Sequence, residues 1–167
     1  MESEIFDVYV AWLYSDQSSS DTAGVRSTDP SKMKGLASIM SKAPAPYGPM
    51  DCMISLWLLG VLLDDVRFTN QVMDQILAYR VHHVHLISMA GMQNIVKEAK
   101  PDSGLRRWLV DHIAAVASPA KYDELEASLP ADVRSAVLKR SLAMRGRSAQ
   151  ESTPTMLKKA DYYQREQ

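Results

Sequence analysis

The sequence has one cysteine and no apolar run long enough to cross a membrane as a helix. Cys52 has no partner for an intrachain disulfide, and it borders an apolar segment of the kind in which buried thiols are common. That segment, from Met53 to Leu63, has about a dozen residues, against the roughly 20 that a bilayer requires. The N-terminal residues are acidic where a secretory signal is basic. We therefore expect an intracellular protein, cytoplasmic or nuclear, that does not bind a membrane.

An excess of charge of either sign is also lacking. The 167 residues include 19 Lys and Arg and 20 Asp and Glu, which gives a formal net charge of -1. A value this close to zero gives no overall electrostatic reason to bind nucleic acid. The length is that of a single domain with one hydrophobic core.

Motifs of several common enzyme classes are absent. The sequence has no glycine-rich phosphate loop, no GxSxG, no HExxH and no CxxC pair. Asp64 and Asp65 are adjacent, but neighbouring side chains in a helix or turn point about 100° apart and do not converge on one bond. An N-cap at a hairpin corner explains these aspartates better. We therefore expect a protein that is not an enzyme, with no cofactor and no catalytic residue.

The first half of the sequence contains helical patterns. Apolar residues between 3 and 14 recur at steps of three and four, which is typical of one face of a helix. Asp51 precedes the apolar run as the expected N-cap of a buried helix over residues 52–62. The helical pattern resumes after the two aspartates, and two helices joined by a short turn form a hairpin. Gly60 either allows close approach of a neighbour or marks the helix end.

Further helices are predicted in the second half. Residues 83–99 predict one helix or a broken pair. Residues 103–116 give the clearest amphipathic pattern, with Asp102 or Ser103 as the N-cap. Trp108 lies on the apolar face of that pattern, and the arginines before it do not.

The composition divides the chain into three parts. We expect a partial helical region at 4–117, interrupted at 15–50 by a flexible insert rich in Ser, Pro and Gly. A helical extension follows at 118–145, with its last helix at 131–145, and residues 146–167 are expected to be a disordered tail. No segment alternates with a period of two, so the predicted fold class is mainly α, with no secure β-sheet.

Three segments, in this order, resemble the C-terminal helical half of BTB/POZ domain proteins, in particular the divergent set common in filamentous fungi. The first segment contains Phe6, Tyr9 and the string WLY at 12–14, and is similar to the family pattern F-x-x-Y/F-x-x-W-L-Y-T-G. The second is the hairpin sequence LWLLGVLLDDVRFTNQVMDQIL, and the third is AKPDSGLRRWLVDHIA. A variable insert separates the first two segments in the family, as it does here.

The resemblance implies a non-enzymatic protein–protein interaction module. In the family, the first half of the domain supplies the sheet and most of the dimer interface, and we expect that half to be missing. Apolar helical faces would then bind a partner or a second copy of the chain. Cullin binding is not expected, because the acidic contact motif belongs to the missing half. The residues expected to contact a partner or to form the core are Trp12, Tyr14, Trp57, Phe68, Val72, Met73 and Trp108.

An alternative is a small helical protein that binds metal or nucleic acid. His82, His83 and His85 are close in sequence, but zinc ligands on a helix are usually four residues apart. The series Arg134, Lys139, Arg140, Arg145 and Arg147 makes the last helix basic over 134–147, but it lacks the interleaved aromatic groups typical of a nucleic-acid surface. Cations are favourable near a helix C-terminus in any case. We therefore expect no metal site and no nucleic-acid binding.

Overall fold

The computed structural model describes residues 2–17, 48–82, 87–145 and 162–163, and these residues form helices and no strand. The mainly α fold class is therefore confirmed. None of the described helices is both long and apolar enough to span a bilayer. The helices are α1 (Glu2–Gln17), α3 (Pro49–Leu62), α4 (Val66–His82), α5 (Met89–Glu98), α6 (Gly104–Val116), α7 (Pro119–Glu126) and α8 (Ala131–Arg145).

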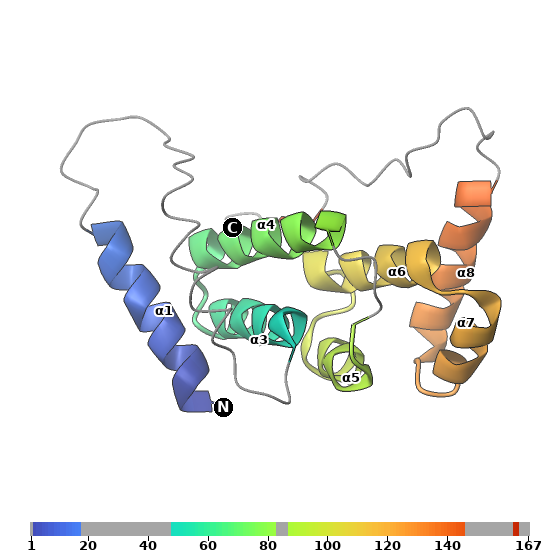
Figure 1. The fold of residues 1–167 in the computed structure, drawn as a ribbon, viewed down its shortest axis with the longest axis horizontal. Coiled ribbons are helices and arrows are strands. Elements are labelled where there is room, and N and C mark those ends of the chain that lie inside the picture. Colours follow the sequence, from blue (N-terminus) through green and yellow to red (C-terminus); the bar gives the residue numbers. More distant parts are fainter. Residues whose placement is uncertain (1, 18–47, 83–86, 146–161, 164–167) are drawn as a thin grey trace.

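The helices follow one another along the length of the molecule. α1 lies at one end, α7 and α8 lie at the other, and α3 to α6 fill the space between (Figure 1). α3 packs against α1, α4 and α5, and α6 packs against α5 and α8. Buried side chains from all seven helices belong to one hydrophobic cluster. The predicted extension at 118–145 therefore shares its core with the rest of the described chain.

Two aspartates and a glycine shape the hairpin of α3 and α4. Asp64 has a φ of 53°, in the left-handed region that aspartate tolerates better than most residues. Asp65 caps α4, because its Oδ1 accepts the main-chain N–H of Phe68 at 2.9 Å. A Cβ on Gly60 would lie 2.5 Å from Oγ1 of Thr69, so glycine lets the two helices approach closely. The prediction of a hairpin with a capping aspartate is confirmed.

The start of α3 differs from the prediction. The helix begins at Pro49, with Gly48 as its N-cap. Proline suits this first turn, because it lacks an N–H that the helix would leave unpaired. Asp51 lies inside the first turn, so the prediction that it is the N-cap is wrong. Its Oδ1 instead accepts a hydrogen bond from the Ser88 hydroxyl at 2.9 Å.

The limits of the expected insert and tail also change. α1 runs to Gln17 and α3 begins at Pro49, so both ends of the 15–50 segment are helical, and its remainder lies outside the described residues. The prediction of a disordered tail at 146–167 is wrong at Tyr162 and Tyr163. Tyr162 is 1% exposed and belongs to the core, and Tyr163 packs against that core. The other residues of the tail are not among those described.

Serine N-caps begin three helices of the second half. Ser88, Ser103 and Ser118 each accept the main-chain N–H three residues further along the chain. Ser103, rather than Asp102, is therefore the cap of α6. Within 83–99 the structure describes one helix, α5, and α8 has the predicted limits. α7 was not predicted.

Candidate functional site

Five of the seven residues expected to contact a partner or form the core lie deep in the core. Each of them is at most 1% exposed, so none presents its side chain to a partner in this conformation. They come from α3, α4 and α6, and they are Trp57, Phe68, Val72, Met73 and Trp108.

The other two residues lie on α1, which is fixed to the hairpin by aromatic side chains. The Trp12 and Phe68 ring centroids are 4.9 Å apart, and Trp12 Nε1 donates to Gln71 Oε1 at 2.6 Å. The Tyr9 hydroxyl donates to Asp65 Oδ2 at 3.1 Å. Tyr14, in contrast, is 72% exposed. The apolar faces of α1 and the hairpin, which the family resemblance left uncovered, therefore cover one another.

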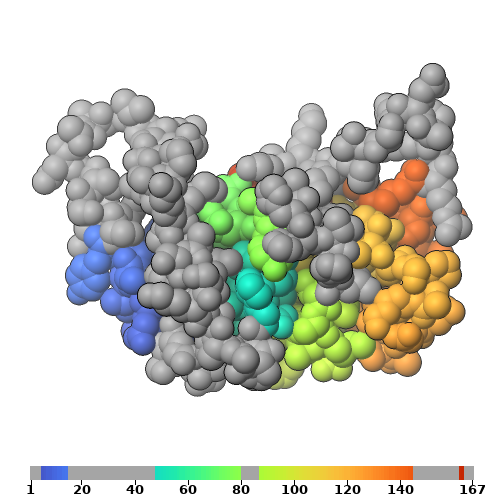
Figure 2. All heavy atoms as spheres, viewed as in Figure 1, coloured from blue at the N-terminus to red at the C-terminus, as the bar shows by residue number. Residues whose placement is uncertain are grey.

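An open groove of about 470 Å³ lies between α6, α7 and α8. This volume is within the usual range of roughly 300–1,000 Å³ for ligand sites in proteins. Figure 2 shows α7 and part of α8 at the surface, at the end of the molecule opposite α1. The lining is mainly apolar and includes Ile113, Val137, Leu138, Leu142, Tyr122 and Asp123.

Two leucines on α8 mark the groove as a candidate site. Leu138 and Leu142 are each 58% exposed, although both are large and apolar. Their spacing of four residues places them on the same side of the helix, one turn apart. Together with the concave surface beside them, they form an apolar patch in the described structure that no neighbouring helix covers.

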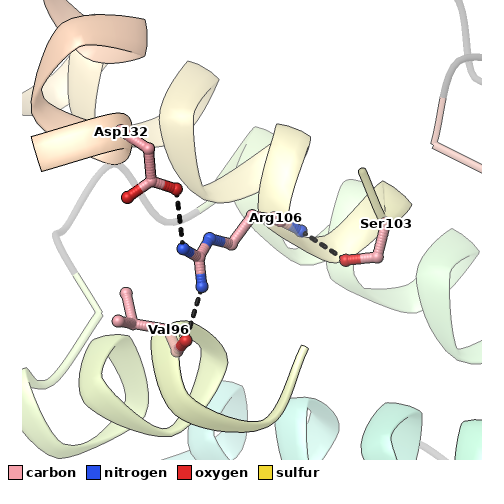
Figure 3. Close-up of polar contacts among 4 residues, drawn as sticks. All are labelled: Val96, Ser103, Arg106 and Asp132. Carbon is pink, nitrogen blue, oxygen red and sulfur yellow. Dashed lines mark hydrogen bonds and ion pairs between the residues drawn. The ribbon is translucent and has the colours of Figure 1, made fainter. Parts of the chain in front are cut away.

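Arg106 of α6 connects this helix to α5 and to α8. Its side chain is 8% exposed, and its guanidinium donates to the Val96 main-chain oxygen on α5 and to Asp132 Oδ2 on α8, the latter at 3.0 Å (Figure 3). The prediction that the arginines lie off the apolar face is wrong for this residue. Its aliphatic stem is buried, and its charged end reaches polar partners on two other helices. Arg106 therefore fixes the first turn of α8 against α6.

Replacing Asp132 by asparagine should destabilise the fold only at a pH where the carboxylate is ionised. The Arg106 hydrogen bond holds the pKa of Asp132 below its ordinary value of 3.8. Because the folded-state pKa is depressed, the pair contributes stability above the unfolded pKa and loses it as the pH falls through the folded pKa. The side chain is 58% exposed. Solvent screening therefore limits the expected loss at neutral pH to less than about 1 kcal/mol.

Urea unfolding of the wild type and Asp132→Asn, at neutral pH and at about pH 2, measures this dependence. Glu124→Gln is the matched control, because Glu124 forms an exposed ion pair with Lys121 inside α7 and ties no two helices together. An equal loss for Asp132→Asn at both pH values would contradict the assignment.

A second ion pair joins α6 to α8. Asp111 is 4% exposed, and its Oδ1 lies 2.6 Å from Nε of Arg140. Arg140 belongs to the basic series of the nucleic-acid alternative, but in the structure it forms an ion pair with Asp111 inside the protein. Lys139 is exposed, and the side chains of Arg145 and Arg147 are outside the described set.

The histidine side chains of the metal alternative lie outside the part of the chain that the structure describes. His82 ends α4 and its side chain is not described, and His83 and His85 lie outside the described residues. Within the part of the chain that the structure describes, no group of three His, Cys, Asp or Glu residues could hold a metal ion. Cys52 is half-buried on α3.

Comparison of the chain with protein-family models, with curated proteins and with solved structures finds no match in any of the three. The site is therefore characterised by its own geometry. It is an open apolar groove on a helical protein, held in shape by two ion pairs that connect α6 to α8.

Proposed function

We propose that the chain is a non-enzymatic protein–protein interaction module, the helical part of a BTB/POZ-type domain, which binds an amphipathic helix of a partner protein. The binding surface is the groove between α6, α7 and α8, and the exposed pair of leucines on α8 is the observation that carries the proposal. The family relation is supported by the order of elements. The three segments that resemble the family fall on α1, on the α3–α4 hairpin and on the loop and helix of α6.

The apolar character of the groove favours a helix as the bound element. An amphipathic helix places apolar side chains at positions i, i+3, i+4 and i+7 along a groove of this kind. α8 has 15 residues and is about 22 Å long, so its wall can contact several turns of a partner. Covering the exposed half of Leu138 and of Leu142 contributes roughly 1 kcal/mol each.

The acidic charge of α7 favours a partner helix with basic residues along one flank. This helix carries three acidic residues and one lysine, and the lysine is already paired with Glu124 at 2.6 Å. Asp123 lines the groove itself. Basic residues along the partner edge that faces α7 would meet an acidic surface, which favours both the rate and the orientation of binding.

Two labelled synthetic peptides test the proposal by fluorescence anisotropy. Both are amphipathic helices with the same row of leucines. The residues that flank this row are lysines in one peptide and glutamates in the other. The lysine peptide should bind at least about 10-fold more tightly. The Leu138→Ser/Leu142→Ser variant should weaken this binding by about 10-fold or more. Leu62→Ser is the matched control, because Leu62 is 80% exposed at the end of α3 and does not line the groove.

Equal binding of the two peptides, or unchanged binding by the Leu138→Ser/Leu142→Ser variant, would show that the groove does not recognise such a helix. Sedimentation of the wild type gives a further check on the occupant. A concentration-dependent dimer that the same two substitutions abolish would assign the groove to a second copy of the chain and would overturn the proposed partner.

A further inference from the structure

Two adjacent tyrosines lie against α4 and α6, far from either helix in sequence. The Tyr162 hydroxyl donates to Asp111 Oδ2 on α6 at 2.6 Å, and the Tyr163 hydroxyl donates to Asp74 Oδ1 on α4 at 2.6 Å. Tyr162 is among the largest fully buried side chains of the described residues. A pair of neighbouring residues therefore contacts one carboxylate on each of two helices.

The surface of α6 is shaped to receive the backbone of this pair. A Cβ on Gly104 would overlap the main-chain carbonyl of Tyr162. The bound segment therefore passes directly over the first turn of α6, where only glycine leaves room for it. No other contact among the described glycines is as close.

The carboxylate on α6 is a fixed hydrogen-bond acceptor. Asp111 is only 4% exposed. Its Oδ1 forms an ion pair with Nε of Arg140 at 2.6 Å. The arginine compensates the charge of the carboxylate, and its Nη2 donates at 3.5 Å to Oδ2, the same oxygen that accepts the Tyr162 hydroxyl. We call Asp74, Gly104, Asp111 and Arg140 the tyrosine-pair site.

Both contacts require the hydroxyl group of a tyrosine and not only an aromatic ring. Burial, with the hydrogen bond and the charge of Asp74, raises the pKa of Tyr163, so its hydroxyl stays protonated and donates. Phenylalanine would fill similar space, but it would leave both carboxylates without these donors. The site therefore distinguishes a pair of tyrosines from a pair of phenylalanines.

We propose that the tyrosine-pair site is a peptide-binding site for two adjacent tyrosines of a partner protein, and that the chain's own Tyr162 and Tyr163 occupy it as a competing internal ligand. The seated segment of the chain itself shows which chemistry the site accepts. An internal ligand acts at a high effective concentration, so a partner binds only after the internal tyrosines are released. This inference concerns a different surface from the groove of α6, α7 and α8, and does not depend on it.

The test uses the full chain and a labelled synthetic peptide with the sequence KKADYYQREQ, which is that of residues 158–167. The receptor is the Tyr162→Phe/Tyr163→Phe variant, which keeps both rings but weakens the internal ligand. This variant should bind the peptide at least about 10-fold more tightly than the wild type does. Tyr14→Phe is the matched control and should behave like the wild type, because Tyr14 is exposed on α1.

Two further measurements assign the binding to the site. Adding Gly104→Ala to the receptor should weaken binding by about 10-fold or more, and so should replacing YY by FF in the peptide. Adding Leu138→Ser/Leu142→Ser should change nothing, which separates this result from the test of the groove. Circular dichroism confirms that each receptor is folded. Equal binding by the wild type and the Tyr162→Phe/Tyr163→Phe variant, equal binding of the FF peptide, or insensitivity to Gly104→Ala would each overturn the proposal.

Discussion

Replacing Trp57 by alanine is expected to lower the free energy of unfolding by about 3–5 kcal/mol. Trp57 is 1% exposed and lies on α3, the helix that packs against α1, α4 and α5. Its removal leaves a large cavity at the centre of the described core. A loss of this size is a large fraction of the roughly 5–15 kcal/mol by which a domain is stable. Urea unfolding, followed by circular dichroism, measures the loss.

Trp57→Phe is the control that separates ring volume from polarity. The indole N–H of Trp57 has no hydrogen-bond partner among the described residues. Phenylalanine therefore removes an unpaired buried donor together with part of the ring, and the two effects oppose each other. We expect Trp57→Phe to cost less than about half of what alanine costs. Equal losses for the two variants would show that the cavity is not the cause.

Replacing Asp111 by alanine is expected to cost about 3 kcal/mol, because it removes one partner of a buried ion pair. Arg140 would lose its contact to the carboxylate, and its side chain is 20% exposed, so water replaces that contact only in part. The Tyr162 hydroxyl would lose its acceptor as well. Urea unfolding at neutral pH gives the change, and Asp123→Ala, at an exposed site on α7, should stay within about 0.5 kcal/mol of the wild type.

The double variant Asp111→Ala/Arg140→Ala identifies the pair as the origin of the effect. Removing both charges leaves no unpaired arginine beside the core, so the double variant should be more stable than the sum of the single losses implies, by about 1 kcal/mol or more. Additive losses would mean that Asp111 and Arg140 stabilise the fold independently of one another.

Features that depend on neighbours in sequence could be predicted. The hairpin follows from an apolar run, two aspartates and a renewed helical pattern. Asp65 lies directly before the first turn of α4, which is the usual position of an N-cap. The same local logic could have found α7. Ser118 and Pro119 are a serine N-cap followed by a proline in the first turn, which is a recognised helix start. The helix has only eight residues, too few for its apolar periodicity to be clear.

Features that depend on residues distant in sequence could not be predicted. Arg106 is buried because its partners come from Val96 and from Asp132, which is 26 residues away. Tyr162 meets an aspartate 51 residues away, and its polar surroundings in sequence indicated a tail. Large aromatic residues were predicted as core or contact groups without a choice between the two, because periodicity shows which face is apolar and not what covers it. The exposed leucines of the groove lie within a helix whose charged residues indicate a basic surface rather than an apolar one.

The carboxylate of Asp65 has a consequence for the cooperativity of the fold. One of its oxygens accepts the N–H of Phe68 and the other accepts the hydroxyl of Tyr9, which is 56 residues away. A single rotamer of one side chain satisfies both partners, so the two contacts are coupled rather than additive. Fraying at the start of α4 would displace the acceptor of the Tyr9 hydroxyl and so weaken the hold on α1, and release of α1 would remove one of the two donors that orient the capping carboxylate. The helix at the edge of the molecule is therefore part of the same cooperative unit as the central hairpin.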